Sequence, residues 1–284
     1  TVFLNLVLDP IFIFGFGPIP AFGVAGAAMV SVLTQGISAG VGIFILARGG
    51  HGIKINWSDM NVNWNWTRKL FQLGLPASLE QSTRAAGMTM MVVLVTSFGS
   101  EVVAAYGIGS RILSLVIVPS LGLAIATTTL VGQNVGAAKL VRAENIGDLA
   151  YKTAFIGLSF LGLLFFLFAE DLTAFFVPDE PQVIQDGALF IKILASSFGF
   201  MGVQQILNGF FNGTGFTKAS MMISILGLWV VRFPLAYFLA YHTSLGYEGI
   251  WWAFPMSNLI SGLAAFTFYK TRYWKKRLAS RRLI

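Results

Sequence analysis

Residues 75–84 read Leu-Pro-Ala-Ser-Leu-Glu-Gln-Ser-Thr-Arg, and they open an apolar segment that continues to about residue 97. The segment is long enough to cross a bilayer, which takes roughly 20 predominantly apolar residues. It nevertheless carries Glu80 and Arg84, whose spacing places them on one face of a helix, where they can pair. Ionisable residues at membrane depth are costly and usually face a bundle interior or a wet cavity. This pair is therefore a candidate polar or ion site, with a structural ion pair near a helix end as the alternative.

The composition excludes an ordinary soluble globular protein. Of the 284 residues, 56 % are hydrophobic and 11 % are charged, whereas soluble domains have about 25 % charged residues. The sequence has no cysteine and two distant histidines, so it predicts no disulfide and no metal cofactor. We expect an all-α membrane protein with about eight transmembrane helices, and no constellation of an enzyme active site is visible.

The expected spans, from alternating apolar segments and polar turns, are 1–16, 21–47, 70–97, 102–133, 149–168, 183–212, 217–241 and 246–270. They suggest four parts: two helices of a first bundle (1–48), a cytoplasmic linker (49–69), a six-helix second bundle (70–270) and a basic cytoplasmic tail (271–284). An apolar run is already under way at Thr1, which indicates part of a longer protein.

The basic residues predict the orientation in the membrane. Most of the 19 Lys and Arg fall in alternate loops near 49–69, 134–148 and 213–218 and in the tail. By the positive-inside rule these segments are cytoplasmic, and the protein is multi-pass in the plasma membrane. The net charge of +7 is then a topology signal, with a tail attracted to anionic membrane lipids, and it predicts no nucleic-acid partner. The basic residues within expected spans are Arg84, Arg111, Lys192 and Arg232.

Asn5 and Asp9 form a second polar pair at membrane depth, again on one helix face. Pro10 follows directly and lacks a backbone N–H, which can leave a carbonyl free near Asp9. A buried carboxylate can take up H⁺, or keep its charge by binding Na⁺ together with Asn5 and such a carbonyl. The pair therefore predicts a cation site, with a structural Asp satisfied by a neighbouring helix as the alternative.

A substrate cavity is predicted from polar and adaptable side chains in the second bundle. Gln204, Asn208 and Asn212 have the spacing of one helix face and supply three amides. Met88 is flexible, and flexible Met side chains are common where binding is promiscuous. Ordinary interhelical hydrogen bonding and packing are the alternatives. The predicted cavity residues are Gln81, Met88, Gln204, Asn208 and Asn212.

An internal repeat relates the start of the chain to its end. In both copies a Pro in an apolar helix is followed by a half-helix, a turn and Gly-x-x-Gly, at 23–26 and at 246–249. Four expected helices precede the second copy, so about four are expected before the first. The whole protein would then have about twelve spans in two six-helix bundles, as in parallel-repeat transporters.

Several motifs together resemble the multidrug and toxic compound extrusion (MATE) family. They are NLVLDP at 5–10, GLPASLEQ at 74–81, LVGQNVGA at 130–137, NGFFNGTG at 208–215, and RFPL at 232–235 followed by LGYEGIW at 245–251. The resemblance covers essentially the whole chain, in the family's order. It implies a partial two-lobe bundle that corresponds to the family's fifth to twelfth helices and lacks the first four. Those four helices, in the same protein, would be the partner of this part.

The resemblance implies an antiporter that exports organic, often cationic, drugs or toxic metabolites by alternating access, driven by Na⁺ or H⁺. It implies cation ligands at Asp9 and Asn5 with a partner Asp on the absent first helix, so this chain alone is not expected to transport. In another branch a Glu of the C-lobe binds the cation, and the corresponding carboxylate here is Glu80, one turn away. No cofactor beyond the coupling ion is implied. Alternatives are a flippase for lipid-linked oligosaccharide or polysaccharide, with a more basic cavity, and a receptor or channel without the two-lobe repeat.

Overall fold

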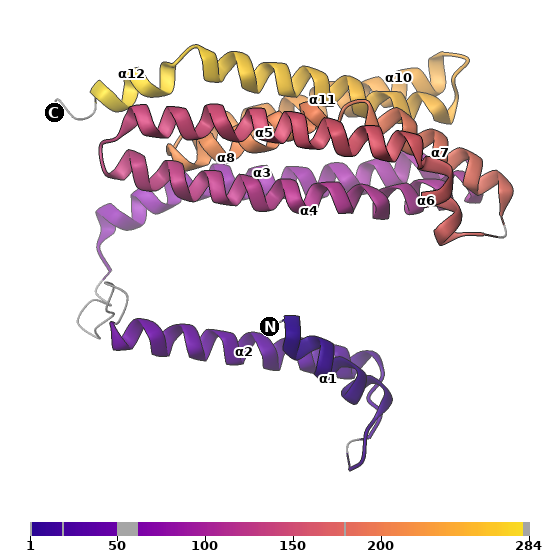
Figure 1. Cartoon of the computed structure of the whole chain (residues 1–284), viewed down its shortest axis with the longest axis horizontal. Helices are drawn as coiled ribbons and strands as arrows, with labels where there is room; N and C mark the ends of the chain where they lie inside the picture. Colours follow the sequence, from indigo (N-terminus) through magenta and orange to yellow (C-terminus); the bar gives the residue numbers. More distant parts are fainter. Residues whose placement is uncertain (1, 19, 50–61, 179, 281–284) are drawn as a thin grey trace. The chain divides into compact units, whose positions relative to one another are not determined.

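The computed structural model describes residues 2–18, 20–49, 62–178 and 180–280, and its described elements are helices joined by turns (Figure 1). The chain divides into two compact units, Thr1–Thr67 and Arg68–Ile284. Most of the predicted linker, residues 50–61, lies outside the described residues. The assignment of the units to two lobes of a transporter stays a prediction.

Unit 1 consists of α1 (Val2–Phe14) and α2 (Val24–Arg48). The turn between them is tied to the end of α1, because the backbone N–H of Phe22 donates to the Phe12 carbonyl at 2.9 Å. Gly26 packs on the same carbonyl so closely that a Cβ there would lie 2.4 Å from the Phe12 oxygen. The two helices thus meet through a small residue, as is usual where membrane helices pack closely.

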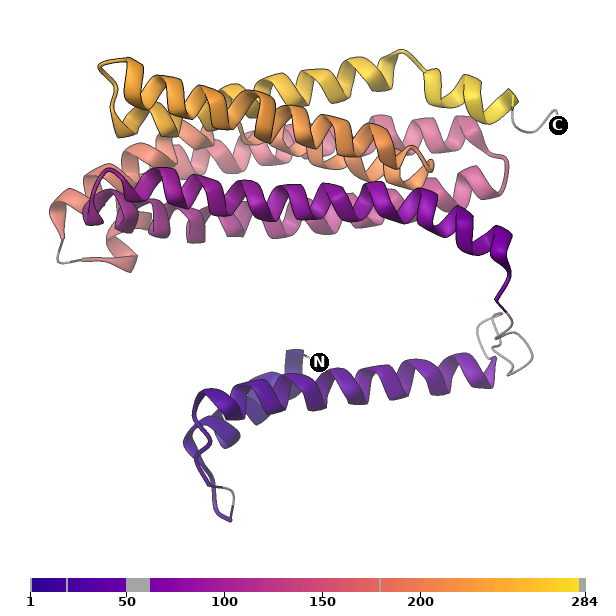
Figure 2. The ribbon, with the colours of Figure 1, turned by 180° about the vertical axis from the view of Figure 1, so that it is seen from behind.

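Unit 2 is a bundle of long helices. In chain order its elements are α3 (Trp64–Thr96), α4 (Ser100–Gly136), α5 (Leu140–Leu167), α6 (Ala169–Phe176), α7 (Pro181–Ala195), α8 (Phe198–Gly213), α9 (Thr217–Ile225), the π-helix η2 (Leu226–Arg232), α10 (Phe233–His242), α11 (Tyr247–Lys270) and α12 (Tyr273–Ser280). Helix α8 packs against α4, α5 and α11. Helices α4 and α5 lie on the face seen in Figure 1, and α3 and the segment from α9 to α10 lie on the face seen in Figure 2.

The internal repeat has the same local geometry in both copies. Gly23, before α2, has φ 56° and ψ −131°, and Gly246, before α11, has φ 55° and ψ −134°. Gly enters this region of backbone conformation without the steric cost that a Cβ would add. Gly249 packs on the preceding helix as Gly26 does, since a Cβ there would lie 2.6 Å from the carbonyl carbon of Leu239.

The span predicted over 183–212 is not one helix. It consists of α7 and α8, which meet at an angle of 56°. At the break, the hydroxyls of Ser196 and Ser197 donate to the carbonyls of Ile193 at 2.6 Å and Leu194 at 2.9 Å. These side chains compete with the helical ladder, and adjacent small polar residues are a common cause of sharp bends.

The span predicted over 217–241 is also irregular. Helix α9 passes into the π-helix η2, which ends at Arg232, and α10 begins at Phe233. Pro234 cannot donate a backbone hydrogen bond to the preceding turn. The turn before it has widened to π geometry, a local distortion found frequently at functional sites.

The basic tail, predicted over 271–284, is helical over part of its described residues. It forms α12, in which Trp274 is fully buried with its ring centroid 4.9 Å from that of Phe210. Just before and within this helix, Arg272 and Lys275 pair with Glu144 near the start of α5. The apolar anchor and these ion pairs explain why this segment packs on the bundle rather than extending into water.

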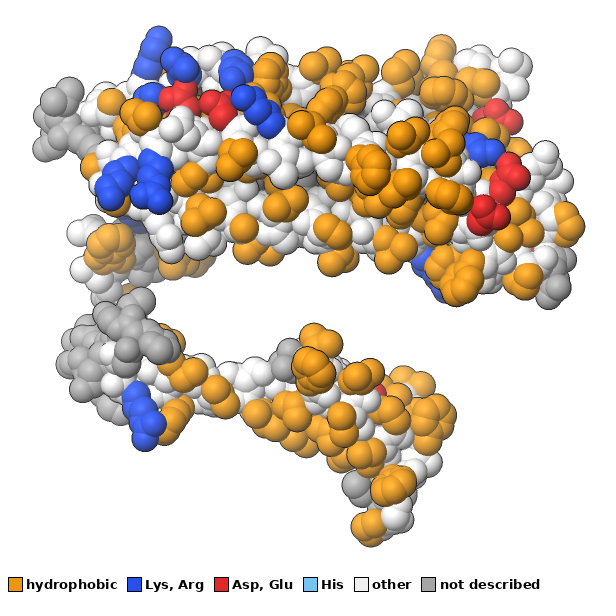
Figure 3. Space-filling model, in the orientation of Figure 1, with side chains coloured by type: hydrophobic (Ala, Val, Ile, Leu, Met, Phe, Trp, Pro, Cys, Tyr) orange, Lys and Arg blue, Asp and Glu red, His pale blue; other side chains and the backbone are white. Residues whose placement is uncertain are grey.

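The described helices include several that can cross a membrane. By length and composition these are α2, α4, α5 and the continuous segment Thr217–His242, with α7 and α8 as a fifth if they form one span. Helices α1, α3 and α11, also predicted as spans, do not meet this criterion: α1 has 13 residues, and α3 and α11 supply the polar side chains described below. On the face of unit 2 in Figure 3, charged side chains gather at the two ends of the helices and the middle is free of them.

Gly209 provides a test of the packing between α8 and α4. A Cβ there would lie 2.5 Å from the carbonyl oxygen of Ala124, so Gly209→Ala should push the two helices apart. We expect the free energy of unfolding to fall by about 1–3 kcal/mol. Gly122→Ala on α4, where nothing lies within 4 Å, is the control and should not lower stability, because Ala favours the helix. Thermal unfolding in detergent measures both variants, and equal midpoints would contradict the close approach.

Candidate functional site

Unit 2 contains a cavity of about 780 Å³ in the middle of the bundle. Its walls come from α3, α4, α7, α8, α9, η2 and α11. Along α11 the cavity residues, at 254–261, lie between two apolar clusters. In one cluster the rings of Phe190 and Trp251 are 4.4 Å apart, and the other surrounds Phe210. The volume is in the range of small-molecule sites, about 300–1,000 Å³.

Three of the five predicted cavity residues line this cavity: Gln81, Met88 and Gln204. Asn208 and Asn212 are not among the lining residues. Although they share a helix face with Gln204, they lie one and two turns further along α8, where the bundle is filled by the second apolar cluster. Asn208 is 2 % exposed and is used for a polar contact behind the cavity wall.

That contact belongs to a buried polar network around Glu80, which is 4 % exposed. The Nη2 of Arg84 donates to its Oε1 at 2.7 Å, and the hydroxyl of Ser220 donates to its Oε2 at 2.6 Å. Asn208 and Ser224 also donate to Oε1, at 3.3 Å and 3.2 Å. A carboxylate with four donors, one of them charged, is well compensated for its burial. The predicted pair of Glu80 and Arg84 is thus present, and an ion-binding role for it stays a prediction.

The cavity wall carries two guanidinium groups, those of Arg84 and Arg232. Arg84 is held by Glu80 and by Gln205, to which its Nη1 donates at 2.6 Å. Arg232 has neutral partners: its Nε donates to Ser257 at 2.7 Å and its Nη2 to Asn258 at 2.7 Å. The sequence placed Arg232 within an expected span but did not assign it to a site. Basic residues are rare at membrane depth, and this rarity was the signal that could have identified Arg232 as a site residue.

In unit 1, Asn5 and Asp9 lie together on α1 as predicted. Thr34 of α2, fully buried, donates from its Oγ1 to the Oδ1 of Asn5 at 2.7 Å. The Oδ1 of Asp9 is buried and accepts no hydrogen bond from the described residues. Carboxylate and amide oxygens of this kind are suitable ligands for a hard cation. Thr34 was missed because, in the sequence, it is one small residue among many on α2.

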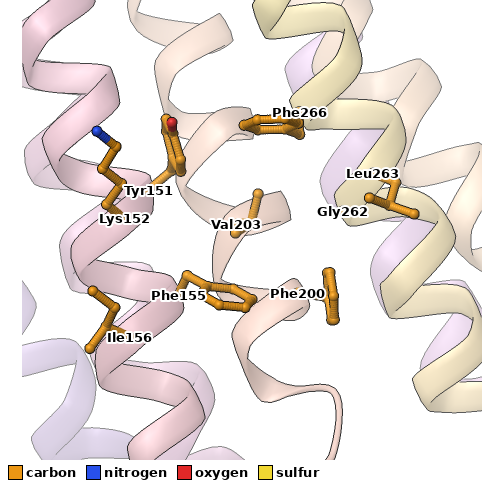
Figure 4. Close-up of a pocket in the computed structure, with 9 residues that line it drawn as sticks. All are labelled: Tyr151, Lys152, Phe155, Ile156, Phe200, Val203, Gly262, Leu263 and Phe266. Atoms are coloured by element: carbon orange, nitrogen blue, oxygen red, sulfur yellow. The ribbon is translucent and has the colours of Figure 1, made fainter.

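A second cavity, of about 290 Å³, lies between α5, α8 and α11 (Figure 4). The rings of Phe155, Phe200 and Phe266 face it, whereas the side chain of Lys152 extends away from these rings. Binding sites for small molecules usually combine apolar walls with a few convergent polar groups. This cavity lacks them among its described lining residues, so the larger one is the better candidate.

Comparison with known proteins decides the family. A family model described as MatE matches residues 76–238, more than half of the chain. The chain belongs to the MATE family. The probable multidrug resistance protein NorM of Thermotoga maritima is 28 % identical over 280 residues, covering 98 % of this chain and 59 % of the relative. The probable multidrug resistance protein YpnP of Bacillus subtilis is 30 % identical over 276 residues, with 97 % and 60 % covered. An FAD transporter of Shewanella oneidensis is 26 % identical over 266 residues, with 93 % and 58 % covered.

Solved MATE structures have the same fold. A crystal structure of MATE in the bent conformation superposes with a TM-score of 0.87 at 26 % identity, covering 97 % of this chain and 61 % of that one. A MOP superfamily transporter from Pyrococcus furiosus, reported to have a binding pocket of reverse polarity, superposes with a TM-score of 0.86 at 27 % identity, with 95 % and 60 % covered. The predicted all-α, MATE-type membrane fold is confirmed. This chain spans about 60 % of the length of the curated relatives that it matches.

Glu80→Gln tests the polar network of this MATE chain. The change keeps the side-chain size but leaves the Arg84 charge, which is 24 % exposed, without its counter-charge. We expect the free energy of unfolding to fall by about 2–4 kcal/mol, with part of the loss recovered in Glu80→Gln/Arg84→Gln. Unfolding in detergent with increasing denaturant measures both variants.

The matched control is Glu170→Gln, which removes a surface pair with Lys192 of the same 2.7 Å length. The hydrogen bond from Lys192 lowers the pKa of Glu170, yet the Glu170 side chain is 70 % exposed. Water screens such a pair, so little change in stability is expected. If Glu80→Gln destabilised the protein no more than Glu170→Gln does, the buried network would not have the structural role described.

Proposed function

We propose that this chain is part of a cation-coupled exporter of organic compounds, such as drugs or toxic metabolites, that works by alternating access in the plasma membrane. The observation that carries the proposal is the cavity of unit 2 in a chain of the MATE family. The cavity combines flexible apolar walls, including Met88, Met91 and Met201, with dispersed amides and hydroxyls. Such walls can accommodate ligands of different shapes.

The proposed coupling site is Asn5 and Asp9, with H⁺ or Na⁺ as the ion. Support comes from the Asp9 oxygen, which is buried without a hydrogen-bond donor among the described residues, because binding a cation would compensate it. Pro10 lies next to Asp9 inside α1 and weakens the helix at that point. Coupling requires that the ion and the substrate favour different conformations of the same element, and the bend of α1 at Pro10 is the proposed element.

The charge of the substrate does not follow from family membership. The names of the relatives include both multidrug resistance proteins and an FAD transporter. The resemblance predicts cations, but no Asp or Glu is found among the described residues that line the unit 2 cavity. The cavity lining therefore gives no support to a preference for cations.

We also propose that the basic segments near 134–148 and 213–218 and the tail face the cytoplasm. In unit 2 these segments lie at one end of the bundle, since Glu144 pairs with Arg272, and Arg277 lies over the ring of Phe216 with 5.7 Å to its centroid. Clustering of positive charge at one end is what the positive-inside rule requires. The proposed partners are organic substrates, membrane lipids and the four preceding helices expected from the family.

A lipid-linked oligosaccharide or polysaccharide flippase is the second candidate, because a basic cavity is expected for it. Arg84 and Arg232 line the cavity, but the charge of Arg84 is compensated by Glu80 at 2.7 Å. One uncompensated guanidinium is a weak match to the several basic groups that a pyrophosphate would require. The exporter is therefore preferred.

Asp9→Asn in the full-length natural protein tests the proposed function. We expect it to abolish ion-coupled efflux with expression intact, because a neutral amide cannot take up H⁺ and binds Na⁺ poorly. Drug efflux from membrane vesicles, with pH and Na⁺ gradients imposed separately, measures the effect and identifies the ion. Asp171→Asn, at an exposed position of α6, is the control and should transport normally. Wild-type efflux by Asp9→Asn would overturn the assignment of the coupling site.

A further inference from the structure

The unit 2 cavity is positively charged as a whole. Among its described lining residues the charged ones are Arg84 and Arg232, with no acidic residue beside them. Glu80 lies behind the wall and compensates Arg84 at 2.7 Å. Its carboxylate already accepts four hydrogen bonds, so it is not a free counter-charge for a second guanidinium. The positive charge that remains in the cavity is that of Arg232.

Arg232 is oriented by neutral groups on one side. Ser257 and Asn258 accept hydrogen bonds from its Nε and Nη2, and its Cζ lies 4.5 Å from the centroid of the Phe254 ring. No carboxylate of the described residues lies within 4.0 Å of its nitrogens, and its Nη1 makes no hydrogen bond with them. A guanidinium has five N–H donors in a planar fork, so donors remain for a ligand. A charge held at membrane depth by neutral partners is stabilised further by an anion.

The backbone around Arg232 is distorted in a way that serves this placement. Arg232 is the last residue of the π-helix η2, which precedes Pro234. Gly227 and Leu228 of the same π-helix also line the cavity, and Gly227 packs so closely on α11 that a Cβ would lie 3.0 Å from the Cβ of Ser261. The π turn and the small residue thus bring the cationic end of η2 against the cavity and next to α11.

The rest of the wall suits an apolar body. Met88, Leu113 and Phe198 line the cavity from three different helices, together with the Phe254 ring beside Arg232. Apolar walls with one oriented charged group are the usual means of binding an amphipathic molecule in a defined orientation. The anionic group would contact Arg232, and the apolar body would lie along these side chains.

We propose that this cavity binds organic anions, meaning molecules with a carboxylate, sulfonate or phosphate group on an apolar or aromatic body, and that Arg232 is the partner of the anionic group. The proposal rests on the transport function proposed above and names the charge class of its substrate. It differs from the cationic preference that the family resemblance predicts.

A matched pair of probes tests it: anilinonaphthalene sulfonate and its uncharged parent, phenylnaphthylamine. Binding to the detergent-solubilised full-length protein is measured by titration calorimetry. Arg232→Gln should weaken binding of the sulfonate by about tenfold or more, because a charge-assisted hydrogen bond is lost. Binding of the uncharged parent should be unchanged, which also shows that the cavity of the variant is folded. Arg232→Lys keeps the charge but not the fork and should lose less affinity than Arg232→Gln.

Two further variants separate local from general charge effects. Arg111→Gln removes the same charge from an exposed position on α4 that does not line the cavity, so sulfonate binding should be unchanged. Gln81→Glu adds a carboxylate to the cavity wall and should weaken sulfonate binding while favouring a cationic dye such as ethidium.

Two results would overturn the proposal. One is an equal loss of sulfonate affinity in Arg232→Gln and Arg111→Gln, and the other is tighter binding of ethidium than of the sulfonate by the unmodified protein. These experiments measure binding and not transport. The anion proposal can therefore be overturned while ion-coupled efflux is intact, and the efflux proposal can be overturned while anion binding is intact.

Discussion

The structure of unit 2 depends on the compensation of one buried negative charge. A carboxylate removed from water is stable only with charged or hydrogen-bonding partners, and Glu80 receives them from its own helix and from two others. Arg84 is one turn away on α3, Asn208 comes from α8 and Ser220 from α9. The other contacts of the bundle are largely apolar and do not depend on direction. Because hydrogen bonds do, the contacts of Glu80 require α3, α8 and α9 to pack in one register. Its partner Arg84 also lines the cavity.

The irregular helices determine what faces that space. A continuous α-helix over 183–212 would have no bend between α7 and α8, and a continuous α-helix over 217–241 would rotate Arg232 about the helix axis relative to α9. The observed breaks, at Ser196 and Ser197 and in the π-helix η2, have local causes in hydroxyl groups and in a proline. Their combined result is a cavity with polar groups at mid-bundle and apolar clusters beyond it.

The two units carry uncompensated groups of opposite charge. In unit 1 a carboxylate oxygen of Asp9 lacks a donor, and in unit 2 the Arg232 guanidinium lacks a carboxylate, both among the described residues. Each is a group that a ligand of opposite charge would stabilise. An ion-coupled exporter needs two such sites with different ligands, and the proposals for H⁺ or Na⁺ at Asp9 and for an organic anion at Arg232 assign one to each.

The sequence by itself determined the class of the protein, because hydrophobic composition, segment length and motif order depend on local residues alone. It also predicted the pairing of Glu80 with Arg84 and the repeat at 23–26 and 246–249, since spacing along one helix or one turn is a local property. The tertiary structure decided which part of α8 lies at the cavity, so that Gln204 lines it while Asn208, one turn further along the same face, donates to Glu80. It alone showed that Thr34 meets Asn5 and that Arg232 has neutral partners. These contacts join residues far apart in the chain, and helix packing, which periodicity does not encode, brings them together.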